Sequence, residues 1–423
     1  MFFFVSVNCF SQDTSVVFKQ KYYNKKVDTY LDKQKALSSY YTIDSKGVSV
    51  YASAQDKLKS NSEYFISWAQ QQEFCKYSKE FNSNSLLKIV QDKKLDSLIS
   101  SSIKKEKIAP TQNKLKGLKI AIDAGHIAGD IAMGEIEKKH LNFKKDSLKG
   151  LSDSIQIAEG MLTFATAKLL KEKLEADGAE VFLTRKCNGY SAFGKTFDQW
   201  LKDDYKKTID SLFKVNEFSL EKKKWYLSAK CSKRDKFRLI FKDLELQKRA
   251  EVINNYQPDF TIIIHFNVDE TNTGWTKPGT KNFDMTFVGG AFMKSDLASA
   301  EKRFEFLRLL LSDDLEKSIA LSSSVVNSLE KKLGVKTAST NDAKYLIQGC
   351  LPTNEKGVFC RNLQLTRYVH SPLVYGEALY QDNINECKAL NKECDKTKNE
   401  RIQQVAEAYY QGVLDYVQNK HAE

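Results

Sequence analysis

Between residues 117 and 420 the chain alternates between short apolar runs and longer stretches in which apolar residues recur at helical spacing. A short apolar run predicts a buried strand, and helical spacing predicts a helix with one buried face. The apolar runs lie at residues 118–123, 180–184, 260–264 and 371–375. The stretches with helical spacing lie at residues 159–176, 243–256 and 400–418. Strands separated by helices predict an α/β fold with a mostly parallel twisted sheet flanked by helices.

The first part of the chain shows none of this alternation. Residues 1–12 are largely apolar and end in small residues but lack a basic start, so they resemble a truncated signal peptide. We therefore expect an exported protein, periplasmic or associated with the cell envelope. Residues 13–100 are rich in Tyr, Lys and Ser, have helix-like stretches near 52–82, and predict a separate N-terminal accessory region without a chemical motif. The polar segment 101–116 predicts a linker to the domain at 117–420.

Three long insertions interrupt the alternating pattern. They cover residues 127–158, 186–242 and 292–345, whereas a strand and a helix are usually joined by roughly two to six residues. The second insertion is rich in Lys and aromatic residues, and the third is strongly helical in pattern. Insertions of this length serve as lids, as partner-binding arms or as decoration of the fold.

Composition narrows the classes of partner. The net charge of +12 comes mostly from scattered Lys residues and favours anionic surroundings such as cell-wall polymers. No zinc-finger, RNP-type or basic-zipper pattern is present, so we expect no nucleic-acid partner. No apolar run approaches the roughly 18–20 residues of a membrane span, so we expect no transmembrane helix. Cys350 and Cys360, and likewise Cys387 and Cys394, are close enough in sequence to close short disulfide loops in an oxidising compartment.

Four residues that can bind a metal or transfer a proton lie at the same end of the predicted strands. His126 follows the first strand, His265 closes a later one, and Glu377 follows the last. Glu159 opens the helix after the first strand, so it begins at the same carboxyl edge, where sites form in open α/β sheets. Two imidazoles and one carboxylate are a familiar ligand set of catalytic zinc, so we expect His126, Glu159 and His265 to bind Zn²⁺. Glu377 is then the expected catalytic carboxylate that accepts a proton from water.

Two other carboxylates compete with Glu159 for the role of ligand. The long gap after the first histidine contains Glu135 and Glu137, and Glu137 with His140 has the spacing of a helical ligand pair. We favour Glu159 because a well-formed helix and a strand follow it directly.

Further polar residues near these motifs have expected supporting roles. Asp123 and Asn267 are expected to orient ligands rather than to bind metal. Arg185 and Arg249 can contact substrate carboxylates, but structural salt bridges are the favoured interpretation. His370 either supports the site or simply starts a strand.

The segments around the candidate residues resemble one family, the zinc-dependent N-acetylmuramoyl-L-alanine amidases of the Amidase_3 type. Residues 120–126, Ile-Ala-Ile-Asp-Ala-Gly-His, resemble the strand that ends in the first ligand histidine. Residues 159–185 resemble the helix that is opened by the ligand Glu and leads to a Leu-Thr-Arg strand. Residues 249–267 resemble the block with the second ligand histidine, and residues 372–383 resemble the block with the catalytic Glu. The resemblance covers about residues 117–420, with the three insertions unmatched.

This resemblance implies hydrolysis of the amide between N-acetylmuramic acid and L-alanine in peptidoglycan. It implies Zn²⁺ as the cofactor, with the ligands and the catalytic Glu377 named above. The chain departs from the family pattern at Ile127-Ala128, where Gly-Gly is usual, and at Tyr375-Gly376, where Leu-Val is usual. The alternatives are another zinc peptidase or amide hydrolase on the same scaffold, and a non-catalytic regulator that binds the cell wall. Such a regulator would have no need of Glu377.

The resemblance also implies that the site can be regulated. Members of the family can carry a helical insertion that blocks the metal until a partner displaces it. Residues 292–345 are the candidate gate here, and an activator protein acting on this insertion is the expected partner. Asp313, Asp314 and Glu316 are placed to reach a cation. The apolar stripe of this insertion consists of Phe304, Leu307, Leu310, Leu311 and Leu315. The other interpretation is that the stripe packs on the sheet.

Overall fold

The computed structural model describes residues 11–80, 83–91, 114–215, 217–272, 274–275 and 277–422. Nearly all of the segment predicted to be a signal peptide, and most of the predicted linker, lie outside these residues. Within the described ranges, no helix combines the length and the apolar character needed to cross a membrane.

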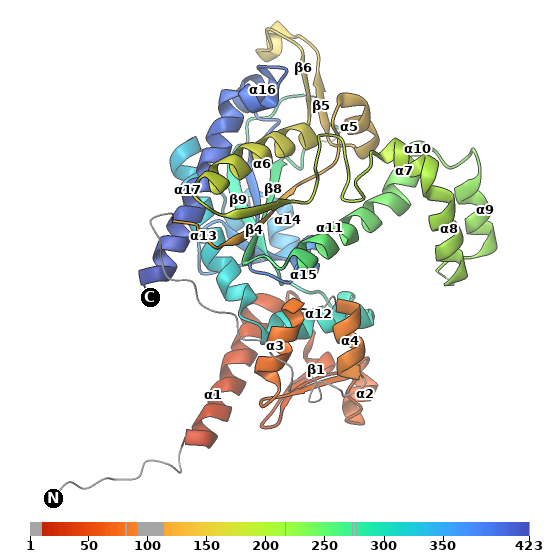
Figure 1. Ribbon diagram of the computed structural model, residues 1–423, viewed down its shortest axis with the longest axis vertical. Helices are drawn as coiled ribbons and strands as arrows, with labels where there is room; N and C mark the ends of the chain where they lie inside the picture. Colours follow the sequence, from red (N-terminus) through yellow and green to blue (C-terminus); the bar gives the residue numbers. More distant parts are fainter. Residues whose placement is uncertain are drawn as a thin grey trace, which may run out of the picture.

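A mostly parallel sheet forms the centre of the fold (Figure 1). Its order is β11-β12-β9-β13-β8-β4-β7, and β10 pairs with β9 outside this path. The strands are β4 (Lys119–Ala124), β7 (Glu180–Leu183), β8 (Phe260–Asn267), β9 (Phe283–Val288), β10 (Lys336–Thr337), β11 (Cys350–Pro352), β12 (Val358–Arg361) and β13 (Leu373–Tyr380). Strands β13, β8, β4 and β7 are parallel to one another, whereas β9 is antiparallel to β13 and β11 is antiparallel to β12. The predicted α/β class is confirmed.

Helices cover both faces of this sheet. The helices on one face are α6 (Glu159–Ala176), α13 (Asp314–Leu333) and α17 (Glu400–Ala422). The helices on the other face are α11 (Lys242–Tyr256) and α15 (Gln364–Tyr368). Ile262 and Ile264 of β8 lie in the core with α6 and α17, while Ile263 lies in the core with α11 and α15. Because successive side chains point to opposite faces, a strand covered on both faces is apolar at every position.

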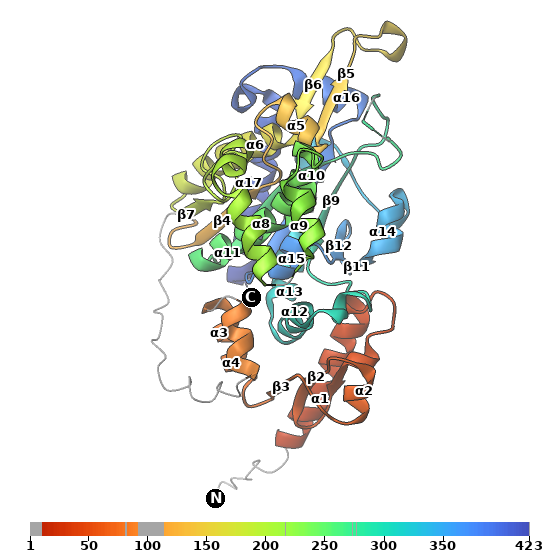
Figure 2. The ribbon, with the colours of Figure 1, turned by 90° about the vertical axis from the view of Figure 1, so that its right-hand side faces the viewer.

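The N-terminal region folds into a small α/β unit at one end of the molecule (Figures 1 and 2). Its strands β1–β3 form an antiparallel sheet. Its elements are α1 (Ser11–Lys26), β1 (Tyr41–Ile43), β2 (Gly47–Val50), α2 (Ala54–Leu58), β3 (Tyr64–Ser67), α3 (Gln71–Glu80) and α4 (Ser83–Gln91). All of these elements except α2 share one hydrophobic core with α12 (Ala300–Leu311) of the third insertion. The N-terminal region is therefore joined to that insertion by a common core.

The apolar stripe predicted to gate the site lies in this common core. The buried stripe residues are Phe304, Leu307, Leu310, Leu311 and Leu315. Their acidic neighbours are paired as well, since Lys79 contacts Asp313 and Asp314. Lys26 likewise contacts Glu316. The placement expected for a gate was wrong, because the stripe faces the N-terminal region. The alternative is right in part, because the same core includes residues of β9 and β12.

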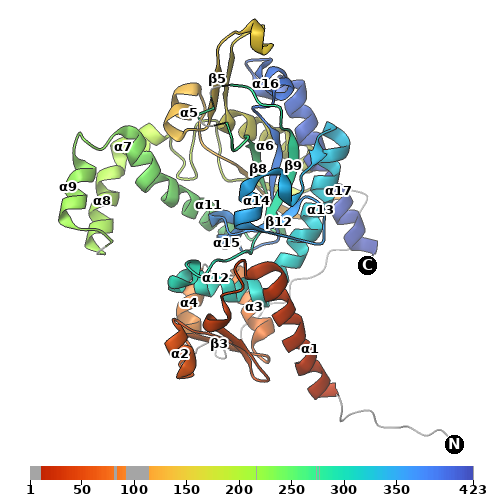
Figure 3. The ribbon, with the colours of Figure 1, turned by 180° about the vertical axis from the view of Figure 1, so that it is seen from behind.

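The other two insertions have separate structures. The first contains α5 (Ile131–Glu137) and the antiparallel hairpin β5 (His140–Phe143) and β6 (Ile155–Ala158), which leads directly into α6. This segment lies at the end of the molecule opposite to the N-terminal region (Figure 2). The second forms a projecting helical arm with its own core (Figures 1 and 3). The arm consists of α7 (Phe197–Asp203), α8 (Tyr205–Lys214), α9 (Leu220–Leu227) and α10 (Lys233–Lys236).

The seven cysteines in the described part of the chain are free thiols. Cys350 is paired in register with Arg361, and Cys360 with Leu351, so the two thiols point to opposite faces of the strands. They accordingly belong to different cores. Cys387 is buried while Cys394 is exposed. The short disulfide loops suggested by sequence spacing are therefore not formed.

Candidate metal centre

The candidate ligands come from three elements that meet at the carboxyl ends of β4 and β8. His126 lies two residues beyond β4, His265 lies within β8, and Glu159 is the first residue of α6. A Cβ atom on Gly125 would overlap the ring of His265, so glycine lets this ring pack directly on the backbone. His126 itself has a φ of 61°, which is unfavourable for a residue other than glycine. Backbone strain of this kind is often retained at functional sites.

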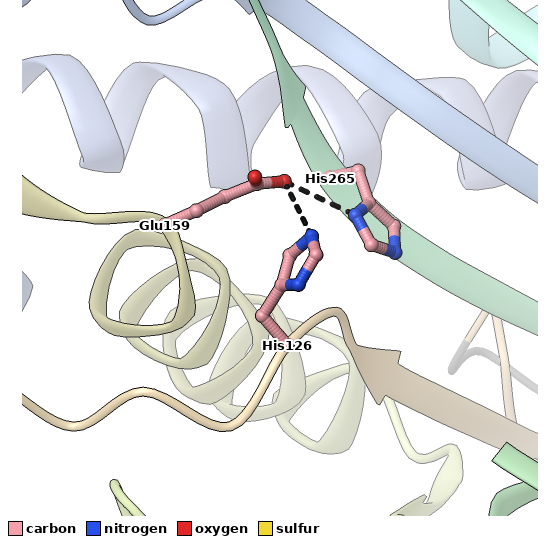
Figure 4. A group of neighbouring side chains, drawn as sticks. All are labelled: His126, Glu159 and His265. Carbon is pink, nitrogen blue, oxygen red and sulfur yellow. Dashed lines mark hydrogen bonds and ion pairs between the residues drawn. The ribbon is translucent and has the colours of Figure 1, made fainter. Parts of the chain in front are cut away.

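The three side chains converge on one point (Figure 4). Glu159 Oε1 lies 3.2 Å from His126 Nε2 and 3.1 Å from His265 Nδ1, and one ligand atom from each residue lies within 4.8 Å of the others. His126 Nε2 and Glu159 Oε2 are buried without a hydrogen-bond partner among the described residues. Buried polar atoms without partners are costly, and a divalent cation would satisfy them. Nitrogen and carboxylate donors in this number fit zinc.

The charges of these groups are strongly linked. Burial alone would raise the pKa of Glu159, but His126 and Lys139 outweigh burial and hold this pKa well below its usual value. Burial would lower the pKa of His126, but Glu159 and Glu137 outweigh it and raise this pKa. Burial lowers the pKa of His265 to about 4. Glu159 is therefore ionised and His265 neutral, as metal binding requires, whereas a metal that binds His126 has to displace a proton.

Glu137 supports His126 from the side away from the other ligands. Its Oε1 accepts a hydrogen bond from His126 Nδ1 at 3.0 Å, and its carboxylate also accepts from the backbone N–H groups of Ile127 and Ala128 at 3.1–3.3 Å. A carboxylate acceptor places a proton on Nδ1, which leaves Nε2, on the side of Glu159, as the ring nitrogen that can bind a metal. Glu137 therefore fixes both the tautomer of His126 and the strained loop that carries it.

The rival ligand assignments receive no support from this geometry. Among the described residues, the one group of metal-binding side chains found contains His126, Glu159 and His265. Glu135 is exposed on α5, and His140 lies on β5 outside that group. Sequence spacing thus correctly placed a carboxylate near His126, but it did not show that Glu137 faces the opposite ring nitrogen.

Glu377 lies beside His265 on the neighbouring strand. The two residues are register partners of the parallel pair β13 and β8. We had expected Glu377 to follow its strand, but it lies within the strand. Burial, followed by the negative charge of Glu159, raises the pKa of Glu377 to about 8. Its Oε2 is buried without a partner in the described part of the chain. A carboxyl group that titrates near neutral pH beside the candidate ligands is suited to proton transfer.

The unusual Tyr-Gly pair before Glu377 has a structural reason. The ring of Tyr375 stacks on that of His265, with 4.5 Å between centroids and 5° between planes. A Cβ atom on Gly376 would overlap the hydroxyl of Tyr409, which comes from α17. The lack of a side chain at Gly376 therefore makes room for the hydroxyl of Tyr409 on the covering helix.

Two buried arginines hold the loop between β4 and His126. Arg249 donates to Asp123 at 3.1 Å and to the carbonyl oxygens of Ala124 and His126 at 2.7 and 3.0 Å. Arg185 donates to the carbonyl oxygen of Ala124 at 3.0 Å. Arg249 forms the expected structural salt bridge, whereas Arg185 is structural through hydrogen bonds to carbonyl oxygens. Asp123 acts on the loop through Arg249 and does not contact a ligand ring.

Two other predicted supporting residues lie away from the ligands. Asn267 donates to the hydroxyl of Tyr345 at 2.8 Å and contacts neither candidate histidine, so its predicted orienting role was wrong. His370 lies just before β13, at the opposite edge of the sheet. Its ring nitrogens contact the carbonyl oxygen of Ser78 at 2.7 Å and Glu305 at 3.1 Å, so it is a structural residue near the strand start.

Sequence reasoning missed Lys139. Its Nζ lies 3.5 Å from Glu159 Oε2 and 5.1 Å from the centre of the Trp275 ring. Burial would lower its pKa, but the carboxylates of Glu159 and Glu377 outweigh burial and raise it. The available signal was the pair of lysines directly after Glu137, which in a sequence is typical of an exposed turn.

Comparison with known proteins identifies the family of the chain. The sequence matches the family described as N-acetylmuramoyl-L-alanine amidase over residues 120–415. The chain belongs to this family. Enzymes of this kind are hydrolases that act on amide bonds of peptidoglycan, and the resemblance noted from sequence motifs is confirmed. No curated protein matches the chain.

Several solved amidase structures are similar to this amidase at low identity. The CwlD amidase from Clostridioides difficile in complex with the GerS lipoprotein is 18% identical, with 72% of this chain and 100% of that chain covered and a TM-score of 0.37. An N-acetylmuramoyl-L-alanine amidase from Clostridium difficile 630 is 16% identical, with 72% and 98% covered and a TM-score of 0.38. The catalytic domain of CwlV from Bacillus (Paenibacillus) polymyxa var. colistinus is 15% identical, with 71% and 98% covered and a TM-score of 0.37.

Proposed function

We propose that this amidase is exported and uses Zn²⁺, held by His126, Glu159 and His265, to hydrolyse the amide between N-acetylmuramic acid and L-alanine in peptidoglycan. The main support is the convergence of the His-Glu-His group with Glu377, the register partner of His265, in a chain of this family. The orphaned buried atoms His126 Nε2 and Glu159 Oε2 favour a bound cation. Retention of Glu377 favours an enzyme over a wall-binding protein.

The residues of the chain divide the work of this reaction. Zinc, when bound, would supply a Lewis acid that polarises the scissile carbonyl and lowers the pKa of water. Glu377 accepts the proton of the attacking water and delivers it to the nitrogen of the departing L-alanine. Burial raises the pKa of Glu377, which favours its role as a carrier of the proton from water to the departing nitrogen. Glu137 keeps Nε2 of His126 available, and Tyr375 fixes the plane of His265.

Product analysis with two active-site variants tests this proposal. Glu377→Gln keeps the shape of the side chain but cannot take up a proton, so we expect zinc to remain while turnover on soluble muropeptides falls by about 10²-fold or more. His265→Ala should lose zinc. Glu135→Gln, an exposed carboxylate on α5, is the matched control and should behave as the unmodified chain.

The products distinguish the proposed bond from other bonds in the stem peptide. Cleavage at the proposed amide leaves the peptide with a free L-alanine amino group and the sugar with a free lactyl carboxylate. A cut within the peptide would favour the alternative of another zinc amide hydrolase. Wild-type turnover by Glu377→Gln would show that the base lies elsewhere, and stoichiometric zinc in His265→Ala would refute the ligand assignment.

A further inference from the structure

Lys139 contacts the candidate ligand Glu159 and is more exposed than that ligand. It comes from the turn between α5 and β5 in the first insertion, and its side chain is 37% exposed, whereas that of Glu159 is 1% exposed. The ring of Trp275 lies 5.1 Å from its ammonium group, within the range of a cation–π contact. The ammonium is thus held between an aromatic ring and the ligand carboxylate, on a side chain that reaches solvent.

The ammonium also has unused donors. A lysine carries three N–H donors and no acceptor. Its contact with Glu159 Oε2 at 3.5 Å is an ion pair at the limit of hydrogen-bond distance, and that oxygen counts as unpaired. Glu159 is thus the ion-pair partner of Lys139, and one such partner leaves further N–H donors of the ammonium open. The charge of Glu377 also acts on this ammonium. Glu377 Oε2, like Glu159 Oε2, is a buried oxygen without a hydrogen-bond partner among the described residues. Donors left open on a partly exposed side chain beside the candidate ligands are available to a substrate oxygen.

We propose that Lys139 contacts the substrate, with its ammonium group donating a hydrogen bond to the oxygen of the scissile carbonyl. This inference rests on the proposed function, because it assigns a position to the amide that the enzyme cleaves. It concerns a residue of the inserted segment, which lies outside the motifs shared with the family. The first insertion would then supply two residues of the site: Glu137, which orients the ligand His126, and Lys139, which contacts the substrate.

The role follows from where charge develops in the reaction. When the oxygen of water bonds to the carbonyl carbon, the electron pair of the C=O π bond moves onto the carbonyl oxygen. When the C–N bond breaks, this pair re-forms the carbonyl, and the nitrogen leaves with the proton carried by Glu377. Lys139 keeps its own protons throughout and stabilises the transient negative oxygen electrostatically. An ammonium fixed in place before the reaction needs little reorganisation at that moment.

Three variants test this assignment. Lys139→Met removes the charge at similar length, Lys139→Arg keeps the charge in another geometry, and Lys138→Met is a control at the exposed neighbouring position. For each, the zinc dissociation constant is measured by competition with a chromophoric chelator, and kcat and KM are measured on a soluble muropeptide. Affinity for a phosphinate that replaces the scissile amide is measured by calorimetry on the zinc-loaded protein.

We expect Lys139→Met to lower kcat by about 10²-fold or more, the size of effect seen when one donor to such an oxygen is removed. KM and the zinc dissociation constant should stay within about threefold, the phosphinate should bind more weakly, and Lys139→Arg should recover part of kcat. Lys138→Met should change none of these quantities.

Two results would overturn the assignment. Zinc binding weakened tenfold or more in Lys139→Met would show that the lysine serves to position Glu159. Unchanged kcat and phosphinate affinity would show that it does not touch the reacting oxygen. Failure of the proposed function looks different, because the unmodified chain would then leave the muramoyl–alanine amide intact, and the role of Lys139 would fall with it.

Discussion

Replacing Glu137 by Gln should weaken zinc binding while leaving the three ligands in place. The carboxylate accepts hydrogen bonds from His126 Nδ1 and from the N–H groups of Ile127 and Ala128, all within 3.3 Å. Loss of such an outer partner typically costs about 10- to 100-fold in metal affinity, or about 1.4–2.7 kcal/mol. Glutamine is uncharged and offers one acceptor oxygen where three donors converge, so we expect the upper half of this range. The strained backbone of His126 loses a support at the same time.

The assay is a competition titration of zinc against a chromophoric chelator, at one pH and one ionic strength. Glu135→Gln is the matched control, because this residue lies on the same helix, is exposed, and contacts no candidate ligand. It should bind zinc as the unmodified chain does. Circular dichroism of the zinc-free proteins checks that both variants are folded. If Glu137→Gln and Glu135→Gln bind zinc equally tightly, the role assigned to Glu137 is refuted.

Three further predictions concern stability. Burial raises the pKa of Asp284 to about 8 from a usual value of 3.8, so its protonated form stabilises the fold fully below about pH 4 and this stabilisation is lost as the pH rises through 8. Between about pH 5 and 8, Asp284→Asn should therefore gain stability relative to the unmodified chain by up to about 1.4 kcal/mol per pH unit. The measurement is the free energy of unfolding in urea as a function of pH, and the same pH dependence in both proteins would contradict this. Gly376→Val should destabilise the fold by about 1–3 kcal/mol through overlap with Tyr409, and adding Tyr409→Leu should recover part of the loss in the same assay. Phe304→Ala should cost about 3–5 kcal/mol and expose the N-terminal region to limited proteolysis, and unchanged protease resistance would argue against the common core.

The sequence was most informative where a strong local pattern and the tertiary structure agree. The helix at 159–176 was predicted with the bounds that α6 has, because its apolar spacing and the following glycine mark both ends. The strand at 260–264 was found because it is buried on both faces and therefore apolar throughout. His126 and His265 could be assigned to one edge of the sheet because parallel strands end together.

What could not be predicted depends on contacts between distant segments. Strands β9 and β12 lie next to each other, beyond β13 in the sheet. They were not predicted, because β9 contains Asp284 and Thr286 and β12 contains Arg361, so neither forms a clear apolar run. The stripe on α12 was recognised as apolar, but its periodicity does not say which surface covers it. Lys139 reaches Glu159 through the path of an inserted turn, and neither composition nor spacing fixes such a path.

The core shared by α12 and the N-terminal region also imposes an order on the making of the protein. Tyr64 donates a hydrogen bond to the carbonyl oxygen of Ala300, 236 residues later in the chain, and Glu63 pairs with Arg303. During synthesis the N-terminal region therefore emerges long before the helix that completes it. Its apolar side chains remain uncovered over that interval, when partly folded chains are prone to aggregate. A nascent chain that stalls before α12 should expose this open surface to chaperones and proteases, which gives the cell a way to recognise an unfinished copy.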